Sequence, residues 1–302
     1  MKPNELIAKI ENGELDKSFK KIYVSDSAVE EQKPRYIRTI KEFINLFGDD
    51  RDVFVLSAPG RTEVCGNHTD HNNGKVLAAS INLDAIAIAA KRDDMKINEK
   101  SEGHGLNEVD ISTLSPDEAE YGRSSSMIKG VAAGLKEKGY EIGGFDACTT
   151  SDVMGGSGLS SSAAFEVLIA TVINHLYNDG KIDAVTVAKA AQFSENVYFG
   201  KPSGLLDQMA SSVGTFVTID FKDTANPVIK KVDFDFAKSG YSLCIVDTHG
   251  NHSDLTDDYA AVRGEMEAVA KAMGKNVLRE VEYEEFFQSL DVLKEKVNDR
   301  AL

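Results

Sequence analysis

The 302-residue sequence contains no tryptophan and only three cysteines, Cys65, Cys148 and Cys244. The cysteines are far apart and odd in number, so the sequence excludes a disulfide framework and a paired-cysteine metal knuckle. Such cysteine usage is typical of a reducing compartment, and we expect a cytoplasmic protein. The absence of tryptophan is compositional and carries no functional weight.

Basic charge and long apolar runs are also scarce. The net charge is −15 and the isoelectric point is near 4.9, which argues against a surface that binds nucleic acid or an anionic membrane. No apolar run approaches the length of a membrane-spanning helix, and residues 1–10 lack the apolar core of a signal peptide. No protein partner is identifiable. The hydrophobic content of 42% suffices for one large domain or two ordinary ones.

Hydrophobic periodicity predicts an α+β fold, because helices and strands do not alternate regularly along the chain. Helices are expected at residues 35–47, 126–138, 165–173, 184–198, 259–273 and 283–297. Strands are expected at residues 53–56, 145–150, 212–219 and 241–247, the last as a central strand. Residues 76–81 and 85–90 predict two paired strands around a polar turn at 82–84, and residues 93–115 predict exposed hairpins or loops.

A glycine- and serine-rich loop is the most informative feature of the sequence. It consists of Gly155, Gly156, Ser157, Gly158, Leu159, Ser160, Ser161 and Ser162, and an apolar helical segment follows. Glycine lets bare backbone approach a ligand, and the start of a helix directs N–H groups and the positive dipole end to the same place. This arrangement suits phosphate, and serine hydroxyls can hold a bridging Mg²⁺ ion. The alternative is a serine N-cap on an ordinary buried helix, which needs one serine and no glycine cluster.

Two further segments have the composition of binding sites. Residues 58–74 place Arg61 and several polar side chains between glycines, which is typical of a binding loop but also of a solvated turn. Residues 200–209 place Asp207 among apolar neighbours, where it is an N-cap, a buried hydrogen-bonded carboxylate or a base in a cleft. Glu195 lies in a helical stretch, where a surface carboxylate is the ordinary interpretation.

Two His-x-x-His pairs, His68 with His71 and His249 with His252, suggest a zinc hypothesis. Neither pair has a third ligand at a suitable sequence spacing. The sequence therefore disfavours metal-dependent hydrolysis.

The three segments, in this order, resemble galactokinases of the GHMP small-molecule kinase superfamily over about residues 53–264. APGR…GNHTDHNNG is specific to the galactokinase branch, GLSSSA is shared across the superfamily, and GxPSGLLDQM is similar to the family's (G)xPCGIMDQ segment. The resemblance implies a two-domain GHMP-kinase fold, with an N-terminal sugar- and ATP-binding domain at 1–210 and a partial C-terminal domain at 211–302. It also implies phosphorylation of galactose by ATP, with Mg²⁺, to galactose 1-phosphate and ADP.

The same resemblance implies residue roles. Asp207 would take the proton from the anomeric 1-hydroxyl, while Arg61 would hold Asp207 ionised and offset negative charge on the reacting oxygens. Ser161 and Ser162 match serines near Mg²⁺, and Glu195 matches a second Mg²⁺-associated position. The loop of residues 155–162 would cradle the phosphates of ATP. The positions that match sugar contacts are Asn67, His68, Asp70, Gly204 and Tyr259, although Tyr259 would otherwise be read as a helix core aromatic.

The sequence departs from the family pattern in two ways. Asn67 stands where many galactokinases have a glutamate that contacts the sugar's 6-hydroxyl, and an amide makes weaker hydrogen bonds than a carboxylate. The family's third glycine-rich motif is missing, so we expect a second domain that is truncated and exposes apolar surface or an open sheet edge. A non-catalytic sugar- and ATP-binding sensor and an inactive fragment remain alternatives, but the presence of both Arg61 and Asp207 favours catalysis.

Overall fold

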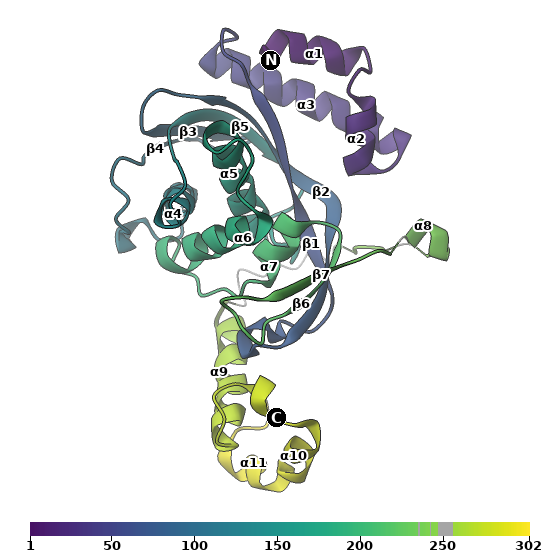
Figure 1. Cartoon of the computed structure of the whole chain (residues 1–302), viewed down its shortest axis with the longest axis vertical. Coiled ribbons are helices and arrows are strands. Elements are labelled where there is room, and N and C mark those ends of the chain that lie inside the picture. Colours follow the sequence, from purple (N-terminus) through teal and green to yellow (C-terminus); the bar gives the residue numbers. More distant parts are fainter. Residues whose placement is uncertain (235, 242, 247–255) are drawn as a thin grey trace.

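A computed structural model describes residues 1–234, 236–241, 243–246 and 256–302. Within these residues a seven-stranded sheet runs in the order β4-β3-β5-β2-β6-β7, and β1 pairs with β2 (Figure 1). The strands are β1 (Phe54–Cys65), β2 (Lys75–Lys91), β3 (Lys96–Ser101), β4 (Leu106–Asp110), β5 (Phe145–Ser151), β6 (Phe216–Asp220) and β7 (Val228–Val232). The pair β3–β5 is parallel and the other strand pairs are antiparallel.

Strand β2 organises the sheet because it is long enough to pair with three other strands. It pairs with β1 over most of its length, with β5 through residues 85–91, and with β6 through residues 75–79. Its side chains alternate between two cores: Ala87 and Ala89 pack on one face, and Ile86 and Ile88 pack on the other. Burial on both faces explains why residues 85–90 of β2 are an uninterrupted apolar run.

The expectation of two strands around a turn at residues 82–84 was wrong. The chain continues through this segment as part of β2, and its pairing with β1 shifts register between Pro59 and Arg61. The extra residues belong to β2 and form an irregularity in the ladder, and such an irregularity bends a strand without reversing it.

Helices cover both faces of the sheet (Figure 1). On one face α1 (Pro3–Glu11), α2 (Asp16–Tyr23) and α3 (Asp26–Phe47) pack on the core that contains Ile86 and Ile88. On the other face lie α4 (Ser124–Glu137), α5 (Ser161–Tyr177), α6 (Ala184–Phe193) and α7 (Leu206–Val213). Helix α5 is apolar on nearly all sides because it is surrounded by β1, β2, α4, α6 and α7.

A buried polar network fixes α3 on the sheet. The Arg35 guanidinium donates to Asp84 Oδ1 at 2.7 Å and to the Thr150 carbonyl at 3.0 Å. The Tyr23 hydroxyl donates to Asp84 Oδ2 at 2.8 Å and lies 2.7 Å from the Tyr36 hydroxyl. These bonds connect α2 and α3 with β2 and β5, so they set the register in which the helices dock.

The remaining described elements connect or follow these strands and helices. They are α8 (Phe236–Ser239), α9 (Thr256–Ala272), α10 (Tyr283–Gln288) and α11 (Leu290–Lys296), the 3-10 turns η1 (Thr69–Asn72), η2 (Glu118–Glu120) and η5 (Leu278–Glu280), and the π-helical turn η3 (Ser194–Tyr198). Helices α9 to α11 form a group beyond β6 and β7 (Figure 1). The Leu278 N–H donates to Asn72 Oδ1 at 3.0 Å, and Arg279 donates to Asp220 Oδ2 at 3.0 Å.

Several sequence predictions are confirmed in substance. They are the helices at 126–138, 165–173 and 259–273, the strand at 145–150, and a hairpin, β3–β4, within 93–115. The predicted boundary between domains at residue 210 falls inside α7, and β6 and β7 after it pair in the same sheet as β2.

Among the described residues every helix is too short or too polar to span a bilayer.

Other predictions were wrong in extent. Helix α3 starts nine residues before the expected position and runs through Pro34. The helix expected at 283–297 is two helices separated at Ser289, and the strand expected at 212–219 starts at Phe216 because α7 continues to Val213.

The strand expected at 241–247 is not formed in the residues that the structure describes. Residues 241 and 243–246 have no regular structure, and Tyr241, Leu243, Ile245 and Val246 are exposed. Residues 242 and 247 lie outside the description. A strand needs a partner for its backbone groups, and local composition cannot provide one.

Candidate active site

Arg61 and Asp207 form a partly buried ion pair between distant parts of the chain. Arg61 lies on β1, which continues to Cys65, so the first half of the segment expected to be a loop is strand. Asp207 lies in the first turn of α7. The Arg61 Nε donates to Asp207 Oδ1 at 2.7 Å, and Nη1 donates to the Gly158 carbonyl at 2.6 Å. One guanidinium therefore joins β1, α7 and the glycine- and serine-rich loop.

Ser160 completes the surroundings of Asp207. Its hydroxyl donates to Asp207 Oδ2 at 2.5 Å. Ser160 occupies the N-cap position of α5 with φ of 60°, but it makes no side-chain cap hydrogen bond. The alternative of an ordinary serine N-cap is therefore wrong, because the hydroxyl points to Asp207 and not to the helix backbone.

The electrostatics keep Asp207 ionised. Burial alone would raise the pKa of this carboxyl, but the Arg61 charge and hydrogen bond, His68 and the Ser160 hydroxyl lower it below its usual value. Among the alternatives left open by the sequence, the N-cap is wrong, because Leu205 holds the N-cap position of α7; Asp207 is a hydrogen-bonded, partly buried carboxylate. A carboxylate that is ionised at neutral pH can accept a proton.

The glycine- and serine-rich loop precedes the N-terminus of α5. Gly156 and Gly158 adopt φ values of 72° and 76°, which favour glycine. The Arg61 N–H donates to the Leu159 carbonyl at 3.1 Å, and a Cβ atom at Gly60 would lie 2.9 Å from the same carbonyl oxygen. The loop thus docks closely on β1. The start of α5 has the free N–H groups and the dipole that suit an anion.

Glu195 is the second buried carboxylate near this helix. It is only 2% exposed, so the surface interpretation is wrong. Its Oε1 accepts from the Ser162 hydroxyl at 3.1 Å and from the Lys201 ammonium at 3.0 Å, and its Oε2 accepts from the Gln208 amide at 2.8 Å. A carboxylate oxygen beside a hydroxyl is a donor set that fits Mg²⁺, which takes few protein oxygens and completes its shell with water and phosphate.

Sequence reasoning missed Glu166, a residue of α5 whose carboxylate lies near that of Glu195. Glu166 is fully buried, and burial and the charge of Glu195 raise the pKa of its carboxyl well above the usual value. The Gln208 amide lies 3.4 Å from Glu166 Oε2 and donates to Glu195, so it bridges the two. A signal was present, because Glu166 is the one charged side chain inside the apolar run of α5.

Asp70 and Gly204 meet at the other side of Asp207. The Leu206 N–H donates to Asp70 Oδ2 at 3.2 Å. A Cβ atom at Gly204 would lie 1.8 Å from the same oxygen, so only glycine fits there. The absence of a side chain at Gly204 thus makes room for the Asp70 carboxylate.

His68 lies between two carboxylates. Its backbone N–H donates to Glu63 Oε1 at 2.9 Å, and its Nδ1 lies 3.7 Å from Asp70 Oδ1. The Asp70 carboxylate raises the pKa of His68, while burial lowers the pKa of His71. Asn67 is exposed with φ of 49°. Within the described part of the chain its side chain has no hydrogen-bond partner.

Two predicted features fall on residues that are only partly described or not described. Tyr259 lies in α9, but its side chain lies outside the described part of the structure. His249 and His252 lie in the segment 247–255, which is also outside it.

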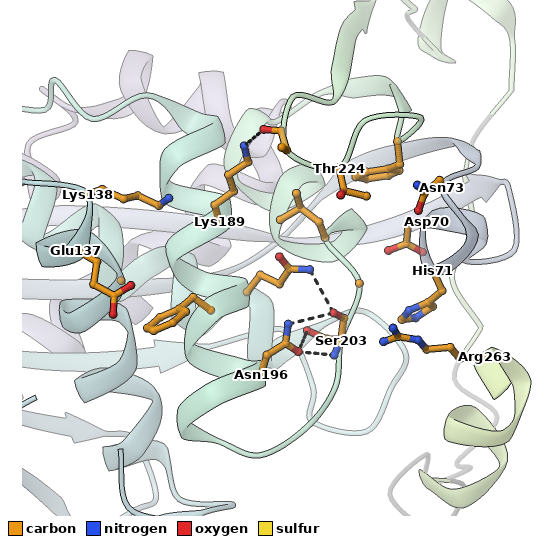
Figure 2. Close-up of a pocket in the computed structure, with 17 residues that line it drawn as sticks. Asp70, His71, Asn73, Glu137, Lys138, Lys189, Asn196, Ser203, Thr224 and Arg263 are labelled. Carbon is orange, nitrogen blue, oxygen red and sulfur yellow. Dashed lines mark hydrogen bonds between the residues drawn. The ribbon is translucent and has the colours of Figure 1, made fainter. Parts of the chain in front are cut away.

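A cavity of about 670 Å³ lies next to the turn that follows β1 (Figure 2). Asp70, His71 and Gly204 line it, together with side chains from α4 and α6 and Arg263 from α9. Arg61, Ser160 and Asp207 are not part of its lining. The candidate sugar contacts Asp70 and Gly204 therefore line this cavity.

The chain matches two family models and many known proteins. Residues 41–91 match the galactokinase galactose-binding signature, and residues 126–215 match the N-terminal domain of GHMP kinases. The chain is 33% identical over 264 residues to a galactokinase of Streptomyces coelicolor, with 87% of this chain and 67% of the relative covered. It is 32% identical over 271 residues to a galactokinase of Clostridium tetani, with 86% and 67% covered.

Solved structures agree with these matches. A Lactococcus lactis galactokinase complexed with galactose superimposes with a TM-score of 0.69 and 28% identity, and the match covers 84% of this chain and 66% of that one. A Methanococcus jannaschii mevalonate kinase gives a TM-score of 0.53 at 14% identity over 81% of this chain and 79% of that one, which shows the fold alone. The chain spans about two thirds of the length of its galactokinase relatives.

Proposed function

The chain belongs to the galactokinase family of the GHMP kinases, and from this membership we propose that it phosphorylates galactose at the anomeric 1-hydroxyl with ATP. The products are galactose 1-phosphate and ADP. The observation that carries the proposal is the partly buried Arg61–Asp207 pair next to the free N-terminus of α5. This places an ionised carboxylate beside a site that suits phosphate.

In the proposed reaction Asp207 is the general base. It accepts the proton of the 1-hydroxyl as that oxygen forms a bond to the γ-phosphorus, and the bond from this phosphorus to the leaving ADP oxygen breaks. Arg61 keeps Asp207 ionised by its 2.7 Å contact and offsets negative charge on the reacting oxygens. Because Arg61 is held by β1 and by the Gly158 carbonyl, the pair is already oriented before substrate binds.

We assign the phosphates of ATP to the loop of residues 155–162 and the N-terminus of α5. Ser162 and Glu195 are the residues that would hold Mg²⁺, and Ser161 precedes Ser162 in the first turn of the helix. When bound, Mg²⁺ neutralises charge on the phosphate oxygens. Gln208 fixes the second oxygen of Glu195, which leaves Oε1 directed towards Ser162. Lys201, which also contacts Oε1, adds a positive charge at the same place.

We assign the sugar to His68, Asp70, Asn67 and Gly204, with Tyr259 as a further contact. Asp70 supports this assignment because its Oδ1 is buried without a hydrogen-bond partner among the described residues. A sugar hydroxyl would supply that partner.

An ADP-release assay with galactose on the 302-residue chain tests the proposal. We expect galactose-dependent release of ADP that disappears in Asp207→Asn. Calorimetry with galactose and with ATP separates the alternatives: binding of both without turnover indicates a sensor, and binding of neither indicates an inactive chain.

A further inference from the structure

Three potential metal ligands converge in the turn that follows β1. The donor atoms of His68, Asp70 and His71 all lie within 4.8 Å of one another. The sequence spacing gave the histidine pair no third ligand, but the left-handed backbone at His68 and the 3-10 turn η1 bring Asp70 between them. The conclusion drawn from spacing therefore fails for this pair.

The buried carboxylate of Asp70 gives an independent indication of a ligand. Asp70 is 6% exposed, and its Oδ1 has no hydrogen-bond partner in the part of the chain that the structure describes. The Nδ1 of His68 lies 3.7 Å from this oxygen, which is too far for a hydrogen bond. Leaving a buried carboxylate oxygen unpaired is costly, so an additional group is expected at this position.

His68 has the surroundings of a metal-ligating histidine. Its Nδ1 faces Asp70, and its Nε2 lies 3.8 Å from Glu63 Oε2. Histidines that bind metals with one ring nitrogen commonly direct the other nitrogen to a carboxylate, which fixes the orientation of the ring. Glu63 is in turn held by the backbone N–H of His68 at 2.9 Å.

From this geometry we propose that His68, Asp70 and His71 bind one Zn²⁺ or a similar divalent transition-metal ion, with water in the remaining position. Two imidazoles and one carboxylate suit these ions, whereas Mg²⁺ and Ca²⁺ prefer oxygen ligands alone. Bonds of about 2.0–2.1 Å set tetrahedral donors roughly 3.3 Å apart, so the side chains close around the ion by small rotations.

The site has a consequence for the proposed sugar binding. Asp70 and His68 are also the residues that we assign to galactose, so the ion and the sugar would compete for the same groups. Figure 2 shows Asp70 and His71 close together among the residues that line the cavity. The metal site itself does not depend on the proposed function, whereas the competition rests on it.

Titration calorimetry with ZnCl₂ in a non-chelating buffer, without nucleotide, tests the site. We expect one equivalent to bind with Kd below about 10 µM. Both His68→Gln and His71→Gln should weaken binding at least tenfold, while His104→Gln, at an exposed hairpin, should not change it. Circular dichroism on each variant checks that it is folded. The variants are independent, so the test survives if one of them does not fold.

The outcomes of these measurements decide the proposal. Absence of binding at 100 µM Zn²⁺, or binding that neither histidine variant weakens, overturns it, and the second result would assign the ion to other groups such as Cys65. Weakened binding in both variants supports it. If saturating galactose also weakens Zn²⁺ binding, the competition is supported. If galactose binds without affecting Zn²⁺, the metal site stands and the sugar assignment at His68 and Asp70 fails.

Discussion

The hydroxyl of Ser160 donates a 2.5 Å hydrogen bond to Oδ2 of Asp207, whose other oxygen is held by Arg61. Both oxygens of the proposed base are thus engaged before any substrate arrives. The same contact removes Ser160 from the helix cap and leaves the N-terminus of α5 open. One hydroxyl therefore links the proposed proton-transfer group to the proposed phosphate site.

Replacement of Asp207 by asparagine should lower kcat for galactose at least about a hundredfold, the lower range for loss of a general base. Galactose affinity, measured by calorimetry, should be largely retained, because the amide keeps the size and one acceptor of the carboxylate. Asp291→Asn, at a fully solvated position of α11, serves as the control and should leave kcat unchanged. Near-normal turnover in Asp207→Asn would remove this residue from the catalytic role.

Replacement of Ser160 by alanine should change the pH dependence of kcat/KM. The pKa of Asp207 lies below its usual value, so activity falls as pH decreases through that pKa. Loss of the Ser160 hydrogen bond removes one interaction that favours the ionised form, and the acid limb should move to higher pH by about one unit. Circular dichroism over the same pH range separates titration from unfolding. An acid limb that stays in place or moves to lower pH contradicts the assigned role.

Replacement of Ser162 by alanine should weaken the binding of Mg·ATP and so raise its KM. Ser162 contacts Glu195 but caps no helix, so the free energy of unfolding should change by no more than about 1 kcal/mol. The measurements are the KM for Mg·ATP and urea unfolding. Ser289→Ala, which removes a bond to the Glu285 carbonyl outside the site, is the matched control. A large loss of stability with normal nucleotide affinity would make Ser162 structural.

The network at Asp84 should matter for stability and not for chemistry. Asp84→Asn leaves the buried Arg35 guanidinium without its main partner, and we expect a loss of about 3 kcal/mol in the free energy of unfolding. Asp152 still faces Arg35 at 3.1 Å, which keeps the loss at the lower end for a broken buried pair. Asp152→Asn, at a partly exposed residue, should cost less than about 1 kcal/mol. The measurement is urea unfolding of both variants. Equal losses in the free energy of unfolding would show that Asp84 is not the main partner of Arg35.

Sequence reasoning located the site where the signal was local. The glycine- and serine-rich loop, Arg61 and Asp207 stand out by composition, and the structure brings all three together. It could not assign the Ser160 hydroxyl, because its partner lies 47 residues away. It misread β2 as a hairpin because the evidence for one strand lies in its non-local pairing with β1 and β6.

Burial was the other quantity that local pattern did not reveal. The local pattern alone indicates a surface carboxylate at Glu195, but contacts from Ser162, Gln208 and Lys201 surround it. The strand expected at 241–247 has the right composition, yet its described residues have no ladder to join. In both cases the outcome depends on which distant segments are present as neighbours, and propensity contains no information about them.

The π-helical turn η3 has a consequence for the changes that this region can accept. It follows α6 directly and leads the chain back so that the Lys201 N–H donates to the Glu195 carbonyl at 3.0 Å. Each helical residue advances the chain by about 1.5 Å and rotates it by about 100°. Deleting Val197 would therefore turn Lys201 and Gly204 away from their partners although every contacting side chain remains in the sequence. The number of residues between η3 and Gly204 therefore matters more than the identity of each side chain. In related sequences we expect substitutions in this segment but no single-residue insertions or deletions.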